Sequence, residues 1–396
     1  MVLHYYYLNL LIVFTLIGVW ELCKLGDCSE ILTGGTPKTS ISEYWEPKKI
    51  PWMSSGEVNK RRLDKTDNMI SEEGLDNSSA RWIKKHSVLI ALAGQGKTRG
   101  TVAVNNINLT TNQSIAAIVP NDNLHYEFIY QNLTKRYDEL RMISSGDGTR
   151  GGLNKQIVSD VIILSPSKEE QIRIGAFFKR LDYAITLHQR KLDQLKELKK
   201  AYLQVMFPEK DEIVPRMRFV DFEGEWELCK LGDVANRYDN LRVPITASKR
   251  ISGNTPYYGA NGIQDFVEGY THDGEFILVA EDGANDLKDY PVQYVNGKVW
   301  VNNHAHVLQA KQSIANNKFL MNAIKNINIE LFLVGGSRAK LNADIMMKLE
   351  INMPVKNEQI RVSEFCTQLD NIITIYQNKL NQLKSLKKSY LQNMFI

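Results

Sequence analysis

The sequence predicts an α+β protein that contains two copies of one unit, each ending in a long coiled-coil helix. Three observations support this prediction. The octapeptide WELCKLGD occurs at residues 20–27 and again, unchanged, at residues 226–233. A longer segment, residues 153–207, recurs without a gap as residues 341–395, with about half of its positions identical. A heptad pattern runs through both copies of that longer segment.

The repeats form a frame around two unlike middle regions. Each copy opens with the octapeptide and closes with Leu-Asn, a proline, Glu-Gln-Ile-Arg and a lysine-rich helix. The two middle regions differ in length and align only at scattered short strings. We therefore expect a shared scaffold that carries two separately adapted binding surfaces. The chain lacks the short, evenly spaced repeats of a solenoid.

The closing segments are expected to form long helices with an apolar seam. Each helix begins soon after a proline, Pro166 or Pro354, and the first ends before Pro208, because proline is excluded from helix interiors. At 1.5 Å per residue such a helix is about 50 Å long, and its seam needs a partner, most simply its twin in the same chain. The predicted seam residues are Leu181, Ile185, Leu192, Leu195, Tyr202, Leu369, Ile373, Leu380, Leu383 and Tyr390.

A lysine occupies one seam position in each helix, Lys199 in the first and Lys387 in the second. A polar seam residue can fix the register and the pairing of two helices. Alternatively, the aliphatic stem packs at the edge of the seam while the ammonium group stays in water. The sequence leaves both interpretations open.

These features divide the chain into six segments. Residues 5–20 carry no charge and are almost long enough to cross a bilayer, whereas the second octapeptide follows a polar lead-in, residues 214–225. We interpret the apolar leader as an altered or misassigned start rather than a membrane anchor. The predicted segments are an atypical apolar leader (1–19), a first α/β domain (20–165), a first helix (166–207), a linker (208–225), a second α/β domain (226–353) and a second helix (354–396).

Charge and cysteine content restrict the function only weakly. Lys and Arg number 49 against 45 Asp and Glu, so the formal net charge of +4 permits a polyanionic partner without requiring one. The four cysteines form no C-x-x-C pair of the kind that a structural zinc site uses. They are expected to be reduced thiols in a cytoplasmic protein.

The first middle region contains a predicted β-hairpin with a glycine-rich loop. Residues 91–98, ALAGQGKT, satisfy a permissive Walker A pattern, but a P-loop must continue into a helix. The residues after Thr98 alternate and are β-branched, which indicates a strand instead. The loop is expected to be tight and to present donors that suit phosphates and base edges, although an ordinary solvated turn is the alternative. The candidate donors are Gln95, Lys97, Thr98 and Arg99.

The second middle region has a strand followed by an acidic turn at the equivalent place, residues 276–286, so the two surfaces should differ in preference. Matched glycine-rich loops precede the shared Leu-Asn in both copies. Their basic residues, Arg150, Arg338 and Lys340, are candidate phosphate contacts or, alternatively, ordinary basic surface. His304 and His306 are expected on one face of a half-buried strand, and no third metal ligand is apparent. No catalytic constellation can be assembled from spacing.

Taken together, the duplicated frame resembles the specificity subunit of type I restriction-modification systems. The resemblance covers residues 20–396 and fails over the leader. Residues 257–284 and 300–308 also resemble strings common in the target-recognition domains of that family, which makes Asn303 and His304 candidate DNA contacts.

The resemblance implies two target-recognition domains, related by pseudo-two-fold symmetry, each reading one half of a bipartite site in double-stranded DNA. An antiparallel pair of helices would set the gap between the half-sites and dock partners. The family's subunit has no catalysis of its own. It assembles with two modification subunits, which methylate adenine using S-adenosylmethionine, and two restriction subunits, which use ATP and Mg²⁺. The alternatives are a membrane-anchored coiled-coil scaffold and, less favoured, a P-loop nucleotide-binding protein.

Overall fold

A computed structural model describes residues 19–94, 96, 98–143, 152–209, 212–336 and 339–395. The chain divides into two units, one formed by residues 1–189 with 379–396 and the other by residues 190–378. Each unit thus combines one α/β domain with part of both long helices. The predicted leader lies outside the described residues except for Val19. Within the described part of the chain, no helix combines the length and apolar character needed to cross a membrane.

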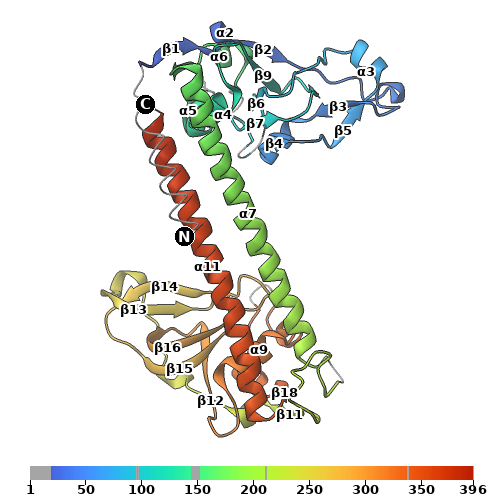
Figure 1. Ribbon diagram of the computed structural model, residues 1–396. Helices are drawn as coiled ribbons and strands as arrows, with labels where there is room; N and C mark the ends of the chain where they lie inside the picture. Colours follow the sequence, from blue (N-terminus) through green and yellow to red (C-terminus); the bar gives the residue numbers. More distant parts are fainter. Residues whose placement is uncertain are drawn as a thin grey trace. The chain divides into compact units, whose positions relative to one another are not determined.

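The first domain is built on a five-stranded sheet with the order β2-β9-β6-β7-β4 (Figure 1). Neighbouring strands are antiparallel, except that β4 runs parallel to β7. A second, three-stranded sheet has the order β5-β3-β8. The strands are β2 (Ser29–Thr33), β3 (Ile50–Met53), β4 (Arg62–Leu63), β5 (Asn68–Ile70), β6 (Val88–Ala91), β7 (Val102–Asn105), β8 (Thr110–Thr111) and β9 (Ile115–Pro120).

The second domain is built on one six-stranded sheet with the order β12-β17-β15-β16-β13-β14. Its strands are antiparallel, except that β13 runs parallel to β16. The strands are β12 (Ala235–Arg237), β13 (Ser252–Gly259), β14 (Gly262–Val267), β15 (His272–Ala280), β16 (Val292–Val301) and β17 (Ala305–Ala310).

The two sheets share their first five positions in order and in direction. β2, β9, β6, β7 and β4 correspond to β12, β17, β15, β16 and β13. The middle regions therefore share a backbone arrangement although their sequences align only in fragments. Strand burial explains this: all four residues of β6 and five consecutive residues at the end of β15 are buried, and many apolar sequences fill such strands equally well.

The repeated frame forms the same small ribbon in both copies. The octapeptide supplies β1 (Glu21–Lys24) and β11 (Glu227–Lys230), which pair antiparallel with β10 (Ile162–Ser165) and β18 (Glu350–Met353). Short helices complete each domain. They are α2 (Leu25–Cys28), α3 (Glu72–Asp76), α4 (Tyr126–Lys135), α5 (Tyr137–Ile143), α6 (Lys155–Ser159), α8 (Leu231–Val234), α9 (Asn317–Lys325) and α10 (Ala343–Met346), with 3₁₀ turns at Ser42–Tyr44, Ser55–Lys60, Asp239–Leu241, Ala247–Lys249 and Ile329–Phe332.

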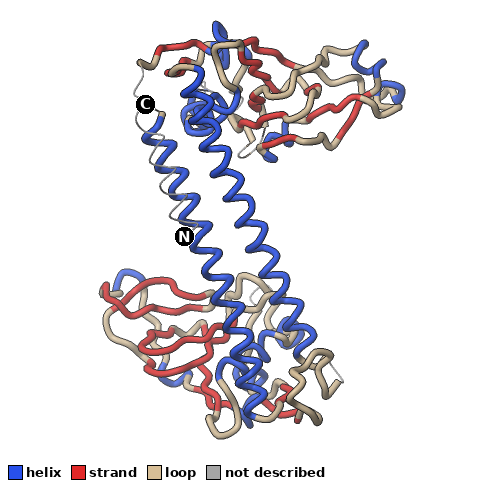
Figure 2. Tube along the Cα trace, in the orientation of Figure 1, coloured by secondary structure: helices blue, strands red, loops and turns tan. Residues whose placement is uncertain are grey.

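The predicted long helices are present as α7 (Lys168–Met206) and α11 (Lys356–Met394), each unbroken over 39 residues (Figure 2). Each is about 58 Å long at 1.5 Å per residue. Every predicted seam residue is at least half-buried. Leu192, Leu195, Leu369 and Leu380 are buried, and Leu181, Ile185, Tyr202, Ile373, Leu383 and Tyr390 are half-buried.

The two seam lysines join the helices through ion pairs. Lys199 Nζ lies 2.5 Å from Asp370 Oδ1 in one unit, and Lys387 Nζ lies 2.5 Å from Asp182 Oδ1 in the other. The residue numbers run in opposite directions in the two pairs, so α7 and α11 are antiparallel. Both lysine side chains are only 14% exposed. The ion pairs support the interpretation that these lysines fix register, and the alternative of ammonium groups left in water is wrong.

Each core is completed by the far end of a long helix. In one unit Phe395, which follows α11, packs against Phe128 of α4, with ring centroids 5.2 Å apart. In the other unit Phe207, which follows α7, packs against Phe319 of α9 at 5.3 Å. The shared Met-Phe ending of the closing segments is therefore a core element, which explains why both copies keep it.

Candidate functional site

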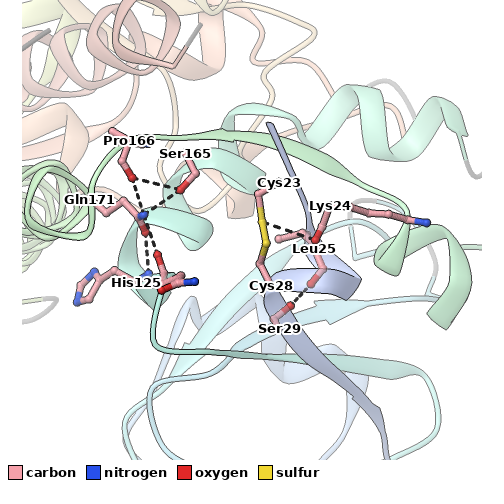
Figure 3. Close-up of a disulfide and its surroundings, with 10 residues drawn as sticks. Cys23, Lys24, Leu25, Cys28, Ser29, His125, Ser165, Pro166 and Gln171 are labelled. Carbon is pink, nitrogen blue, oxygen red and sulfur yellow. Dashed lines mark hydrogen bonds between the residues drawn. A yellow bond between two sulfur atoms is a disulfide. The ribbon is translucent and has the colours of Figure 1, made fainter. Parts of the chain in front are cut away.

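The Glu-Gln-Ile-Arg motif attaches each long helix to its domain. The Gln171 side chain is fully buried; its Nε2 donates to the carbonyl oxygens of Asn123 and Pro166 and to Ser165 Oγ, and its Oε1 accepts from the His125 N–H (Figure 3). In the second copy Gln359 donates to the carbonyls of Ile314 and Pro354 and accepts from the Asn316 N–H. The motif's glutamine thus holds the helix start against the loop before α4 or α9.

The cysteine prediction is corrected by a disulfide between Cys23 and Cys28 (Figure 3). Cys23 lies in β1 and Cys28 ends α2, so the short helix folds one thiol back onto the other. The second copy has Cys229 and Val234 at the matching positions, and Cys229 is a free thiol there. The spacing of five residues did not by itself indicate a disulfide. The two thiols meet because the residues between them form the helical turn of α2.

The glycine-rich segment of the first copy is a hairpin loop, as predicted. Strands β6 and β7 pair antiparallel, and β7 follows Thr98 without an intervening helix, so the P-loop requirement is not met. The loop is not a two-residue turn, however: the last bonds of the hairpin join Ala91 to Gly100 and Thr101, so the loop begins at Leu92 and ends at Arg99. Thr98 Oγ1 accepts a weak bond of 3.4 Å from Asn59, and Arg99 is half-buried. Gln95 and Lys97 lie outside the described residues.

Three of the predicted contacts in the second copy gather at the end of β15. His304 Nδ1 lies 2.5 Å from Asp282 Oδ1, and Lys340 Nζ lies 2.7 Å from Glu281 Oε1. Asn303 is exposed beside them, and its carbonyl oxygen lies 3.4 Å from Arg242. Lys340, which the sequence suggested for phosphate contact, is therefore already paired with an acid.

The histidine pair of the second copy does not share one strand face. His304 lies in the turn before β17, whereas His306 lies within β17 and is 1% exposed. The prediction that both lie on one face of a strand is wrong because β17 begins only at Ala305. The His306 ring nitrogens lie 2.6 Å from Asp239 Oδ2 and 2.8 Å from the Leu341 carbonyl oxygen, so both face acceptors.

The acids around His306 form a closed ionic network. Burial opposes ionisation of Asp239, but the hydrogen bonds from His306 and the Val307 N–H and the charge of Arg242 together outweigh it and lower the pKa of the Asp239 carboxyl. Burial likewise opposes ionisation of Glu281, and hydrogen bonds from Lys340 and Arg242 lower its pKa. Asp239, Glu281 and His306 could in principle hold a metal ion. Because Arg242 and Lys340 already neutralise these acids, the geometry is better explained by ion pairing.

The loops before the shared Leu-Asn are anchored identically. The Leu153 N–H bonds the Leu92 carbonyl just after β6, and the Leu341 N–H bonds the Glu281 carbonyl just after β15. The points at which the two loops rejoin their domains are therefore matched. Arg150 and Arg338, the basic residues predicted there, lie outside the described residues.

The first copy has an ionic network of its own, formed by residues of β4, α4, α7 and α11. Arg62 of β4 forms a bidentate pair with Glu127 of α4, with N···O distances of 2.9 and 2.5 Å, and lies 3.4 Å from Asp182 of α7. Asp182 also accepts from Gln131 at 2.9 Å and from Lys387 of α11. Glu127 is 1% exposed. This network ties the edge strand of the first sheet to both long helices.

A group of cations that the sequence analysis did not single out lies between α3 and β6. Arg81, Lys84 and Lys85 are exposed, and Trp82 between them is 48% exposed. No described carboxylate forms an ion pair with any of the three cations. The signal in the sequence is an RWIKKH string that contains no acid.

Comparison with protein families identifies two matching regions. The model of the type I restriction modification DNA specificity domain matches residues 18–197 and 223–385. Both matches begin next to an octapeptide and end within a long helix. The family model therefore recognises the same duplication that the fold displays.

Individual relatives agree with this family. A Haemophilus influenzae protein described as a type I restriction enzyme specificity subunit is 46% identical over 150 residues, which is 37% of this chain and 38% of the relative's length. A type I restriction enzyme specificity subunit of Methanocaldococcus jannaschii is 25% identical over 74% of this chain and 72% of its own length. The crystal structure of a type I restriction-modification S subunit from M. genitalium has a TM-score of 0.70 at 16% identity, covering 97% of this chain and 98% of that chain.

Proposed function

Because this chain belongs to the family of type I restriction-modification DNA specificity proteins, we propose that it selects the DNA sequence on which such a system acts. A specificity subunit is not itself an enzyme. We propose that each α/β domain reads one half of a bipartite site in double-stranded DNA. The observation that carries the proposal is the pair of domains with one strand order and unlike surface chemistry, since one scaffold used twice with different side chains suits two different half-sites.

The two-reader proposal is tested by exchanging one domain. Replacing residues 27–152 with the corresponding region of a relative should change one half of the methylated sequence and leave the other half intact. The measurement is a map of methylated adenines in the genome of a cell that carries this chain with its modification subunit. A change in both halves would rule out two independent readers.

The long helices are proposed to set the gap between the two half-sites. One heptad inserted after Gln189 and another after Asn378 would lengthen α7 and α11 equally by about 10 Å and preserve both seams. The gap should widen by about three base pairs, at 3.4 Å each, while both half-sites stay the same. An unchanged gap would exclude a spacing role for the helices.

Repeated exposed residues are the proposed docking points for two modification subunits. Ile172 and Ile360 occupy the same motif position at the start of α7 and α11 and are 44% and 38% exposed. Leu22 and Leu228 occupy the same octapeptide position and are also exposed. One surface present twice fits two copies of one partner. Ile172→Ser should leave one modification subunit bound, and the double variant with Ile360→Ser none, as read from the mass of the assembled complex.

The chemistry is proposed to come from those partners. The modification subunits would methylate adenine with S-adenosylmethionine, and two restriction subunits would use ATP and Mg²⁺. The proposed location is the cytoplasm, where DNA and these partners occur. The P-loop alternative is disfavoured because β7 follows the glycine-rich loop directly. The membrane-anchored scaffold would rest on the leader, which lies outside the described residues apart from Val19.

A further inference from the structure

The segment Arg81–His86 of the first domain combines exposed side chains with a rigid backbone. Ile83 and Ser87 are fully buried and anchor the segment. Ile83 exchanges backbone hydrogen bonds with Leu109, at 2.8 and 3.2 Å. The exposed residues between and beside these anchors therefore have little freedom to move with respect to the sheet.

One buried asparagine holds the rest of the segment in place. The Asn105 side chain is fully buried; its Nδ2 donates to the carbonyl oxygens of Lys84 and Ile107, and its Oδ1 accepts from the Ser87 N–H. The His86 N–H donates to the Asn105 carbonyl oxygen at 2.7 Å. A ligand that bound here would not have to order the backbone, which removes one of the usual entropic penalties of binding.

Positive charge gathers around this rigid segment. The His86 ring stacks on Tyr126 at 4.7 Å with an interplanar angle of 10°. Burial lowers the pKa of the His86 imidazole, and the nearby charges of Lys85 and Lys179 of α7 lower it further. Lys179 is also exposed and forms no ion pair with a described carboxylate. Lys85 and Lys179 therefore both lie close enough to His86 to act on its charge, and neither forms an ion pair with a described carboxylate.

A second pair of adjacent lysines in the same domain shows the opposite arrangement. Lys48 Nζ lies 3.5 Å from Glu46, and Lys49 Nζ lies 3.3 Å from Glu72. Both of these side chains are more than half exposed. All four lysines are exposed, and the two pairs differ in whether an acid partner is present.

We propose that Arg81, Lys84 and Lys85 bind the phosphates of the half-site read by the first domain, and that Trp82 packs against the sugar or base edge between them. This inference rests on the proposed function, since it names the residues of this chain that hold the DNA. Exposed cations on a preorganised backbone bind phosphates without first breaking an ion pair. An exposed indole flanked by cations supplies apolar contact to a sugar or a thymine methyl group.

The test compares Lys84→Ala/Lys85→Ala with Lys48→Ala/Lys49→Ala in the complete complex with its modification subunit. The DNA probe is a duplex that carries the methylated site found in cells for the unaltered chain. Losing two phosphate contacts should weaken binding about 10- to 100-fold at 0.1 M salt and reduce the slope of log K against log [salt] by about two. The control pair should leave the slope unchanged within about half a unit. Lys84→Gln/Lys85→Gln repeats the test if the alanine variant folds poorly.

The outcomes separate this inference from the function on which it rests. If the unaltered complex binds its site selectively and both lysine pairs behave alike, the phosphate assignment is wrong while the function stands. If the unaltered complex has no preferred site, the proposed function itself fails. Trp82→Ala should relax base preference only in the half-site of the first domain; a change confined to the other half-site would overturn the assignment.

Discussion

The two domains have the same backbone order but different chemistry at matched positions. Glu281 follows β15 where Leu92 follows β6, and both carbonyls bond the shared leucine of the Leu-Asn pair. By strand register, His306 of β17 occupies the place of Ala116 in β9. The second copy therefore has a buried ionic network where the first copy is apolar.

This difference shows which parts of the unit tolerate change. The frame keeps its glutamine, its seam and its Met-Phe ending because these residues complete the domain core and its attachment to the helix. Beyond the frame, packing requires only that buried apolar side chains fill the space around a strand or that buried charges are paired. The two copies meet this requirement with different residues. Diversity in the middle regions thus leaves the shared arrangement of five strands intact and alters both surface and buried side chains.

The largest effect should come from removing the aromatic end of a helix. Phe395→Ala should destabilise the unit that contains Phe128 by about 3–5 kcal/mol, and Phe207→Ala should do the same to the unit that contains Phe319, because each leaves a cavity. Hydrogen exchange by mass spectrometry would locate the loss of protection. The exposed matched positions Gln392→Ala and Gln204→Ala are the controls. Equal loss in both units from one substitution would show that the two cores are not independent.

The next effect tests the difference at the octapeptide. Cys28→Val gives the first copy the residue of the second, Val234, and removes the disulfide. Without reductant, unfolding of the first unit should become easier by about 2 kcal/mol, because a short covalent loop is opened in the unfolded chain. Chemical denaturation with and without a reducing agent measures it. An equal loss in the presence of reductant would mean that the valine itself packs badly.

A smaller effect should separate the two seam ion pairs. Asp182 is 20% exposed and Asp370 is 45% exposed, although their lysine partners are equally buried. Double-mutant cycles with Asp182→Asn/Lys387→Gln should give a coupling of about 1–2 kcal/mol, and Asp370→Asn/Lys199→Gln less than about 1 kcal/mol, because water weakens the exposed pair. Equal couplings would show that burial does not distinguish the two pairs.

The last effect appears only in acid. The carboxyls of Asp239 and Glu281 have folded-state pKa values below their ordinary values of 3.8 and 4.5. They therefore add stability above about pH 4.5, and this contribution is lost as the pH falls through their lowered pKa values. Glu281→Gln should reduce the acid sensitivity of the second unit, measured by hydrogen exchange against pH, and the exposed control Glu268→Gln should not. If both variants behave alike, the network does not contribute through its charge.

Much of the fold follows from patterns that lie close together in the sequence. The duplication is readable because the two copies share identical strings. Both long helices and the hairpin around the glycine-rich loop are readable because helix and strand periods recur every few residues. The antiparallel pairing was expected from the family resemblance, and the ion pairs of Lys199 and Lys387 bear it out.

The candidate site was less readable, because local sequence does not reveal partners from distant segments. Lys340 was predicted to contact phosphate, yet in the folded chain it pairs with Glu281. Lys84 and Lys85 were not predicted as contacts, and neither has an acid partner among the described residues. The charge available at a surface depends on such pairings.

The sequence by itself thus determined that one unit is used twice, that each copy ends in a seam-bearing helix, and to which family the duplicated frame is similar. Only the tertiary structure decided which cations are neutralised, which cysteines meet and which helix end completes which core. The physical reason is that periodicity acts between near neighbours, whereas the ion pairs between the helices and the core contacts of the helix ends join residues tens to hundreds of positions apart. The disulfide joins near neighbours, but it depends on the turn of α2 that brings Cys28 back to Cys23.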